Sequence, residues 1–98
     1  MTSNFEILVT GASGLIGNAI CEKLLQEGIS FLAVSRKSAT EKWKCLNINL
    51  EKDDLEIALK QFDFKTIIHC AALIPNNNNS YEECYKVNSL IDNNIIEY

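Results

Sequence analysis

The stretch that decides the fold is Thr10-Gly11-Ala12-Ser13-Gly14-Leu15-Ile16-Gly17, with three glycines at GxxGxxG spacing. It follows a short apolar run at residues 5–10 (FEILVT), which predicts a buried parallel strand. It opens an amphipathic segment at residues 15–27, which predicts a helix that Gly28 ends. Free backbone N–H groups and the helix dipole converge at such a junction, so the turn predicts a phosphate-binding site.

Each glycine of this turn has its own predicted role. Gly11 permits the tight turn, Gly14 lets a pyrophosphate approach the backbone without a Cβ in its path, and Gly17 lets the helix pack close to the sheet. A glycine motif alone is weak evidence, and the alternative is a turn whose glycines serve packing only. The strand before it and the helix after it favour phosphate binding.

The rest of the chain continues to alternate strands and helices. Further strands are expected at residues 30–35, 44–48 and 66–70, and further helices at residues 53–62 and from residue 80 onward. This alternation predicts an α/β, Rossmann-like parallel sheet of order 3-2-1-4 with helices on both faces, incomplete as a Rossmann domain. Since no repeat or linker is visible, residues 1–98 are expected to form a single domain.

Apolar stripes at helical spacing predict which helix faces are buried. The stripe of the first helix consists of Ile16, Ile20 and Leu24. The last helix is expected to begin with a capping box formed by Ser80 and Glu83. Its stripe consists of Cys84, Val87, Ile91 and Ile95.

Composition excludes several classes of partner. The net charge of -4, with few and dispersed basic residues, argues against nucleic acid. No apolar run approaches the ~20 residues of a membrane span, and no secretory signal is visible. The four cysteines form no CxxC pair, so reduced thiols in a cytoplasmic protein are favoured over two disulfides. The single histidine, His69, lies in an apolar strand and is interpreted as a core residue, and no metal site is expected.

The motif TGASGLIG resembles the TGxxGxxG motif of the extended short-chain dehydrogenase/reductases, the branch with nucleotide-sugar epimerases, dehydratases and related reductases. Further matches follow in the same order along the chain: Asn49-Leu50, Ile68-His69-Cys70-Ala71-Ala72, Tyr85-Lys86-Val87-Asn88 and Asn94-Ile95-Ile96-Glu97. The resemblance covers essentially the whole chain. It implies the amino-terminal, NAD(P)-binding part of an oxidoreductase or a nucleotide-sugar epimerase/dehydratase.

The resemblance also implies a set of cofactor-binding residues. The amides of Leu15 and Ile16 would face the pyrophosphate, Asn49 would contact the adenine amino group through its side-chain carbonyl, and Leu50 would touch the adenine ring. Ala71 and Ala72 would line the ribose and nicotinamide. The full set is Gly11, Ser13, Gly14, Leu15, Ile16, Gly17, Arg36, Asn49, Leu50, Ala71 and Ala72.

The choice between NAD and NADP depends on the end of the second strand. An acid there binds the ribose 2′-OH of NAD, while an arginine accommodates the 2′-phosphate of NADP. The strand ends Ser35-Arg36-Lys37, without an acid. Arg36 could bind the phosphate with its guanidinium and stack on the adenine, or be a solvated surface charge. NADP is favoured over NAD.

The acid–base pair of the resembling family, YxxxK, does not occur in these residues, and no catalytic residue is assigned. Asp92 stands where the family often has threonine, and Ile91 where it often has glycine. Asn88 is interpreted either as a positioning residue or as a helix-packing residue.

The expected partners are a dinucleotide, a small-molecule substrate such as a nucleotide sugar, and a second copy in a homodimer, with no nucleic acid and no membrane. The alternative function is a non-catalytic NAD(P)-binding or sensing module.

Overall fold

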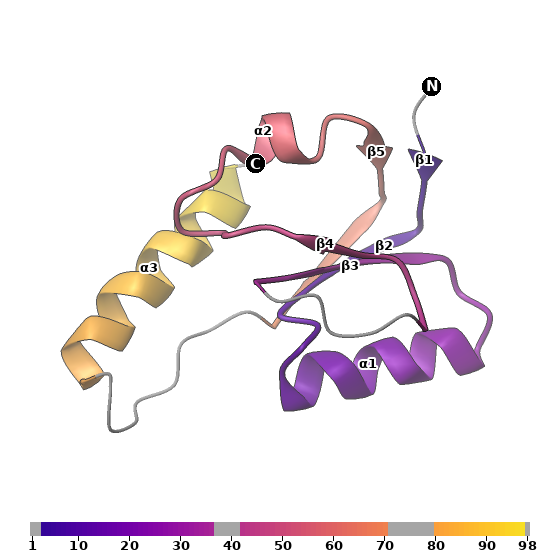
Figure 1. Cartoon of the computed structure of the whole chain (residues 1–98), viewed down its shortest axis with the longest axis horizontal. Helices are drawn as coiled ribbons and strands as arrows, with labels where there is room; N and C mark the ends of the chain where they lie inside the picture. The colour runs from indigo at the N-terminus through magenta and orange to yellow at the C-terminus, as the bar shows by residue number, and fades with distance from the viewer. Residues whose placement is uncertain (1–2, 37–41, 71–79, 98) are drawn as a thin grey trace.

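The computed structural model describes residues 3–36, 42–70 and 80–97. Four parallel strands form the main sheet in the order β4-β3-β2-β6 (Figure 1). They are β2 (Ile7–Thr10), β3 (Phe31–Ser35), β4 (Cys45–Asn47) and β6 (Thr66–His69). These are the four strands expected from the sequence, shorter by one or two residues at their ends, and the predicted order 3-2-1-4 is confirmed.

Helices cover both faces of this sheet, as predicted. The helix α1 (Leu15–Gln26) lies on one face, and α2 (Leu55–Ala58) and α3 (Tyr81–Glu97) lie on the other (Figure 1). Consecutive side chains of the central strands alternate between the two faces. Leu8 and Leu32 pack in the core on the α2 and α3 side, while Val9 and Ala33 pack in the core beneath α1. Because both faces are covered, β3 is buried along its whole length.

The helix α1 ends in a glycine turn. Gly28 has a φ of 70° and follows the last turn directly. Its N–H donates to the carbonyl of Leu25 at 3.2 Å, and the N–H of Ile29 donates to the carbonyl of Leu24 at 3.0 Å. These two bonds form a Schellman motif, which satisfies carbonyl groups that the helix end would leave unpaired. The predicted role of Gly28 is confirmed.

The buried face of α1 differs from the predicted one. The helix buries Gly17, Cys21 and Leu24, while Ile16 is 68% exposed and Ile20 is only partly buried. The predicted stripe is therefore wrong at Ile16. The physical reason is the close packing of Gly17 against the turn after β2, which turns the preceding residue away from the sheet.

The second helix is shorter than predicted. The sequence pattern favours a helix over residues 53–62, but α2 has four residues and is followed by the strand β5 (Phe62–Asp63). Asp54 caps α2, since its carboxylate accepts hydrogen bonds from the N–H groups of Glu56 and Ile57. β5 pairs in parallel with β1 (Ser3–Asn4), and the ring of Phe62 contacts that of Phe5, so tertiary pairing ends the helix early.

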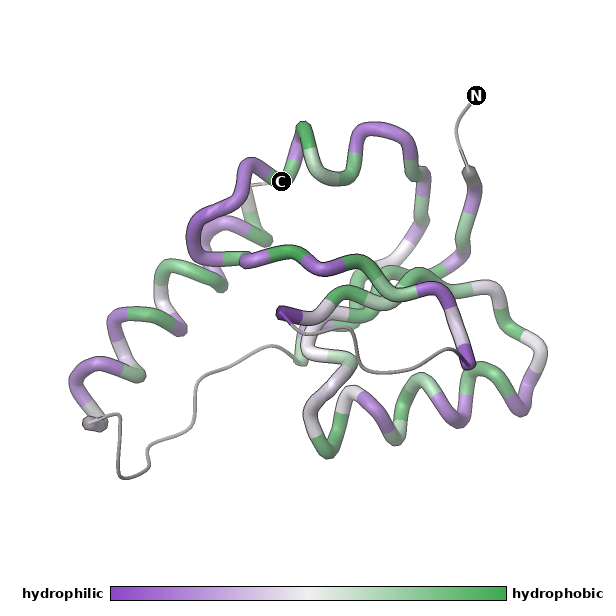
Figure 2. Tube along the Cα trace, viewed as in Figure 1, coloured by the Kyte–Doolittle hydropathy of each residue, from purple (hydrophilic) through white to green (hydrophobic). Residues whose placement is uncertain are grey.

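The last helix begins as predicted. The hydroxyl of Ser80 accepts a hydrogen bond from the N–H of Glu83 at 3.1 Å, which is the side-chain half of a capping box. The predicted stripe is confirmed: Cys84 and Ile91 are buried, and Val87 and Ile95 are partly buried. Hydrophilic residues gather in the turn before α2 and recur along α3 (Figure 2).

Gly17→Ala is expected to destabilise the intact protein. A Cβ at this position would lie 2.7 Å from the carbonyl carbon of Gly11, so the turn or the helix would have to shift. We expect a loss of free energy of unfolding on the order of 1–3 kcal/mol, measured by urea denaturation. Gly14→Ala is the matched control, because its Cβ would meet the Gly11 oxygen at 3.4 Å, an ordinary contact. Equal stability of both variants with the wild type would contradict this packing.

The thiol of Cys21, which is buried beneath α1, is expected to react more slowly than the partly buried thiols of Cys45 and Cys70. All four cysteines are free, and burial, with smaller contributions from Cys45, Cys70 and Glu22, raises the pKa of Cys21 from 9.0 to about 11. The folded state thus keeps this proton where the unfolded chain loses it, which lowers stability as the pH rises above 9.0. At pH near 8, iodoacetamide should label the partly buried Cys45 and Cys70 before Cys21, as followed by mass spectrometry. Urea-unfolded protein is the control, and equal labelling rates in the folded state would contradict the expectation.

Candidate functional site

The predicted site residues that the structure describes lie after strands at one edge of the main sheet. In a parallel sheet the carboxyl ends of all strands meet at the same edge, which is where ligands bind in open α/β folds. The turn at Gly11 follows β2, Arg36 follows β3, and Asn49 comes two residues after β4. β2 is hydrogen-bonded to β3 on one side and to β6 on the other, so the glycine turn lies at the centre of this edge.

The glycine turn presents the amino terminus of α1 at this edge. Gly11 has a φ of 67°, a conformation that L side chains rarely adopt. The N–H of Gly14 donates to the Gly11 carbonyl at 3.0 Å, and Gly14 then precedes the helix in extended conformation. Among the described residues, no side chain caps this terminus and no acid lies in its first turn. Backbone N–H groups and the positive end of the helix dipole are therefore available to an anion.

Two apolar side chains stand exposed beside the turn. Leu15 is 91% exposed and Ile16 is 68% exposed. Ser13 and Gly14 are exposed as well, while Ala12 is buried. The sequence pattern assigned Ile16 to the core, and its exposure is consistent with its other predicted role at the phosphate.

Arg36 is exposed directly after the last residue of β3. Within the described part of the chain, its guanidinium forms no ion pair. By contrast, the preceding residue, Ser35, is buried and its hydroxyl lies 3.4 Å from the sulfur of Cys45. The backbone at the end of β3 is thus held in place while the arginine extends into solvent.

Asn49 organises the turn that follows β4. Its side-chain carbonyl accepts hydrogen bonds from the N–H groups of Glu51 and Lys52, at 3.0 and 3.3 Å. Its own N–H donates to the carboxylate of Asp53 at 2.7 Å. The side-chain oxygen is therefore engaged within the turn, as in an Asx turn. This leaves the side-chain NH₂ as the group with hydrogen-bonding capacity for a ligand.

The neighbour of Asn49, Leu50, belongs to the hydrophobic core. It is only 5% exposed, so its predicted contact with adenine depends on a small part of its surface. Its carbonyl accepts a hydrogen bond from the side-chain amide of Asn94 on α3 at 2.7 Å. This bond ties the turn after β4 to the last helix. The sequence matched Asn94 to a family motif but did not predict its partner.

A chain of side-chain hydrogen bonds crosses the end of β6. The hydroxyl of Thr10 and Nδ1 of His69 lie 2.6 Å apart, and Nε2 of His69 lies 2.9 Å from a carboxylate oxygen of Asp92. The Thr10 hydroxyl also accepts a hydrogen bond from the N–H of Cys70 at 3.1 Å. Both ring nitrogens of His69 are thus partnered, and its side chain is 23% exposed, so it lies at the border of the core. The predicted contacts of Ala71 and Ala72 lie outside the described residues.

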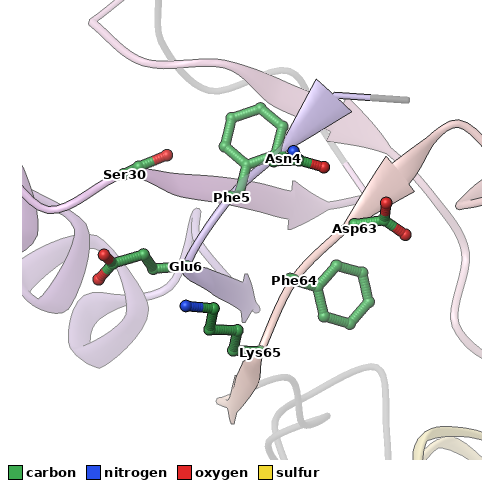
Figure 3. A pocket seen from close by; sticks show the side chains of 7 residues that line it. All are labelled: Asn4, Phe5, Glu6, Ser30, Asp63, Phe64 and Lys65. Carbon is green, nitrogen blue, oxygen red and sulfur yellow. The ribbon is translucent and has the colours of Figure 1, made fainter. Parts of the chain in front are cut away.

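A pocket of about 400 Å³ lies at the opposite edge of the sheet (Figure 3). It is lined by Asn4, Phe5, Glu6, Ser30, Asp63, Phe64 and Lys65. These residues precede β2, β3 and β6, so the pocket lies at the amino ends of the strands. It contains none of the predicted cofactor-binding residues.

Within the described residues, no group of three or more His, Cys, Asp or Glu could hold a metal ion. Among the helices of the described residues, none is both long enough and apolar enough to span a membrane.

The chain matches a protein-family model. The model of the NAD dependent epimerase/dehydratase family matches residues 7–98, nearly the whole chain. The chain is 32% identical over 90 residues to the decarboxylating sterol-4-alpha-carboxylate 3-dehydrogenase of Dictyostelium discoideum, covering 85% of the chain and 27% of that relative. It is 32% identical over 65 residues to methionine adenosyltransferase 2 subunit beta of Xenopus laevis, covering 66% of the chain and 19% of that relative.

Longer chains in solved structures share the fold. MoeE5 in complex with UDP-glucose and NAD superposes with a TM-score of 0.74 at 27% identity, covering 94% of this chain and 31% of that chain. UDP-glucose 4-epimerase of Thermus thermophilus in complex with NAD superposes with a TM-score of 0.78 at 24% identity, covering 94% and 32%. The chain therefore spans about a third of the length of these structures.

Proposed function

This chain belongs to the NAD dependent epimerase/dehydratase family, and from that premise we propose that it is the dinucleotide-binding part of an NAD(P)-dependent oxidoreductase or nucleotide-sugar epimerase/dehydratase. The observation that carries the proposal is the exposed amino terminus of α1, which follows a positive-φ glycine at the carboxyl edge of a parallel sheet. A pyrophosphate placed there accepts hydrogen bonds from the N–H groups of Leu15 and Ile16.

The glycines of the turn support the approach of the pyrophosphate in this proposal. Gly11 holds the turn in its left-handed conformation, and Gly14 offers a backbone surface without a side chain. The hydroxyl of the exposed Ser13 supplies a further donor beside the phosphates. The turn keeps this shape because Gly17 packs against Gly11 from below.

The adenine lies over the turn that follows β4. Because the carbonyl oxygen of Asn49 is engaged by Glu51 and Lys52, its NH₂ group is the one that reaches the base, where it donates to a ring nitrogen rather than accepting from the amino group. The exposed part of Leu50 contacts the ring. Ala71 and Ala72 line the ribose and nicotinamide side.

Arg36 favours NADP over NAD as the cofactor. Its exposed guanidinium stands at the end of β3, where it can bind a 2′-phosphate with two parallel hydrogen bonds. The structural relatives MoeE5 and UDP-glucose 4-epimerase were solved with NAD. The complex of MoeE5 with NAD supports a site for the dinucleotide scaffold, to which Arg36 would add affinity for the phosphorylated form.

The substrate of the intact protein is a small molecule, with a nucleotide sugar as the first class to test, since MoeE5 was solved in complex with UDP-glucose and NAD. Residues 1–98 make up one domain whose role is to hold the cofactor, and they include no Tyr–Lys acid–base pair. The free thiols support a cytoplasmic location. A homodimer is the proposed assembly.

A second candidate function is a non-catalytic NAD(P)-binding module. The observation that favours it is the likeness to methionine adenosyltransferase 2 subunit beta, a relative named as a subunit of a larger assembly. Turnover distinguishes the two candidates: oxidation or reduction of the cofactor on a nucleotide sugar supports the enzyme, while tight cofactor binding without turnover supports the module.

Gly14→Val is expected to abolish dinucleotide binding and leave the fold intact. The extended backbone at Gly14, with φ of -78° and ψ of 169°, accepts a β-branched residue, but the side chain would occupy the path of the pyrophosphate. Calorimetric titration of the intact protein with NAD and NADP measures the loss, and circular dichroism with thermal unfolding checks the fold. Unchanged affinity in a folded variant would exclude this turn as the phosphate site.

Arg36→Ala is expected to weaken NADP binding by on the order of 1–3 kcal/mol and to leave NAD binding nearly unchanged. Only NADP carries the 2′-phosphate that the guanidinium would bind. Parallel titrations of wild type and variant with both nucleotides give the difference. Lys42→Ala is a matched control, because it also removes one exposed positive charge. The ammonium group of Lys42 forms an ion pair of 3.0 Å with Glu22 of α1. The assignment is wrong if the wild type binds NAD as tightly as NADP.

A further inference from the structure

The hydrogen-bonded chain of Thr10, His69 and Asp92 ends beside the glycine turn. Thr10 is the last residue of β2 and the residue before Gly11, and it is fully buried. His69 is the last residue of β6 and lies directly opposite Thr10 in the parallel pairing. Asp92 reaches His69 from α3. Three elements are thus joined at one point of the carboxyl edge.

The partners determine where the protons lie. The carboxylate of Asp92 can only accept, so the ring nitrogen that faces it, Nε2, carries the hydrogen. In the neutral imidazole Nδ1 is then an acceptor, and the Thr10 hydroxyl donates to it. The same hydroxyl accepts from the N–H of Cys70. The orientation of the Thr10 hydroxyl, directly before the glycine turn, therefore depends on Asp92 of the helix α3.

We propose that Asp92 and His69 are positioning residues of the nucleotide site: Asp92 selects the Nε2–H form of His69, and His69 orients Thr10 at the entrance to the glycine turn. The proposal rests on the proposed dinucleotide binding. In the sequence, His69 is 59 residues from Thr10 and 23 residues from Asp92. His69 is 23% exposed and Asp92 is 56% exposed, so α3 reaches the cofactor edge through a partly shielded bond.

Loss of the acid should change the histidine and the affinity together. In Asp92→Ala, the imidazole loses its carboxylate partner, so its protons should redistribute between Nε2 and Nδ1. Two-bond ¹H–¹⁵N correlation spectra of the labelled intact protein report this redistribution, with His69→Gln identifying the resonances. Titration with NAD and NADP should show about fivefold weaker binding.

Conservative variants separate positioning from packing. Asp92→Asn retains a side-chain oxygen that accepts from Nε2, and Thr10→Ser retains the hydroxyl, so both should keep near wild-type affinity. Thr10→Val removes the hydroxyl and should weaken binding as much as Asp92→Ala. If the three residues act as one chain, the effects of Thr10→Val and Asp92→Ala should not add. The variant that combines both should then bind the nucleotide about as tightly as the single variant with the lower affinity.

Two variants of α3 serve as controls. Asn93→Ala changes the next, exposed residue and should alter neither the spectrum nor the affinity. Ile91→Val trims a buried core residue, so it should lower stability while leaving the histidine spectrum and the nucleotide affinity unchanged. A loss of affinity in Ile91→Val equal to that in Asp92→Ala would assign the effect to packing and overturn the proposal.

The outcomes also separate this inference from the function on which it rests. If the wild type binds nucleotide, and Asp92→Ala binds equally tightly or keeps the Nε2–H spectrum, the positioning role is refuted and the proposed function stands. If the folded wild type binds neither nucleotide, the proposed function fails and the positioning role falls with it, even where the spectrum shows the expected form of His69.

Discussion

The close contact between Gly17 and the carbonyl group of Gly11 is the constraint on which the rest of the structure depends. Because position 17 carries no side chain, the first turn of α1 lies directly against the loop that leaves β2. The helix then buries Cys21 and Leu24 beneath the sheet. Its amino terminus comes to lie at the carboxyl edge. One packing contact thus determines both the hydrophobic layer on this face and the direction of the free N–H groups.

The sequence was sufficient to predict the order of the sheet, since strand periodicity, right-handed crossovers and one glycine turn leave few alternatives. It also predicted the end of α1 at Gly28 and the cap of α3 at Ser80, because both depend on neighbouring residues only. It placed Ile16 wrongly. A hydrophobicity pattern cannot distinguish a side chain that faces the core from one exposed beside a ligand site.

The parts that were missed depend on long-range contacts. β1 and β5 are two residues each, and they form because Phe5 and Phe62 bring the two segments together. Such short pairings have no periodicity to detect. Among the proposed site residues, Asn49 could be found from a motif, but the engagement of its carbonyl oxygen within the turn became visible only from the folded backbone. That engagement changes the hydrogen bond it can offer.

The two edges of the sheet differ in electrostatics because α1 runs antiparallel to β2. Its amino terminus, the positive end of the helix dipole, lies at the carboxyl edge with the glycine turn. Its carboxyl terminus lies near Ser30, which lines the pocket at the amino edge (Figure 3). Of the residues that line this pocket, Glu6 and Asp63 are acidic and Lys65 is basic, and the negative end of the dipole adds to the acidic charges. A phosphate is therefore favoured at the turn and disfavoured in the pocket. The direction of one helix thus decides which edge of the sheet favours an anion.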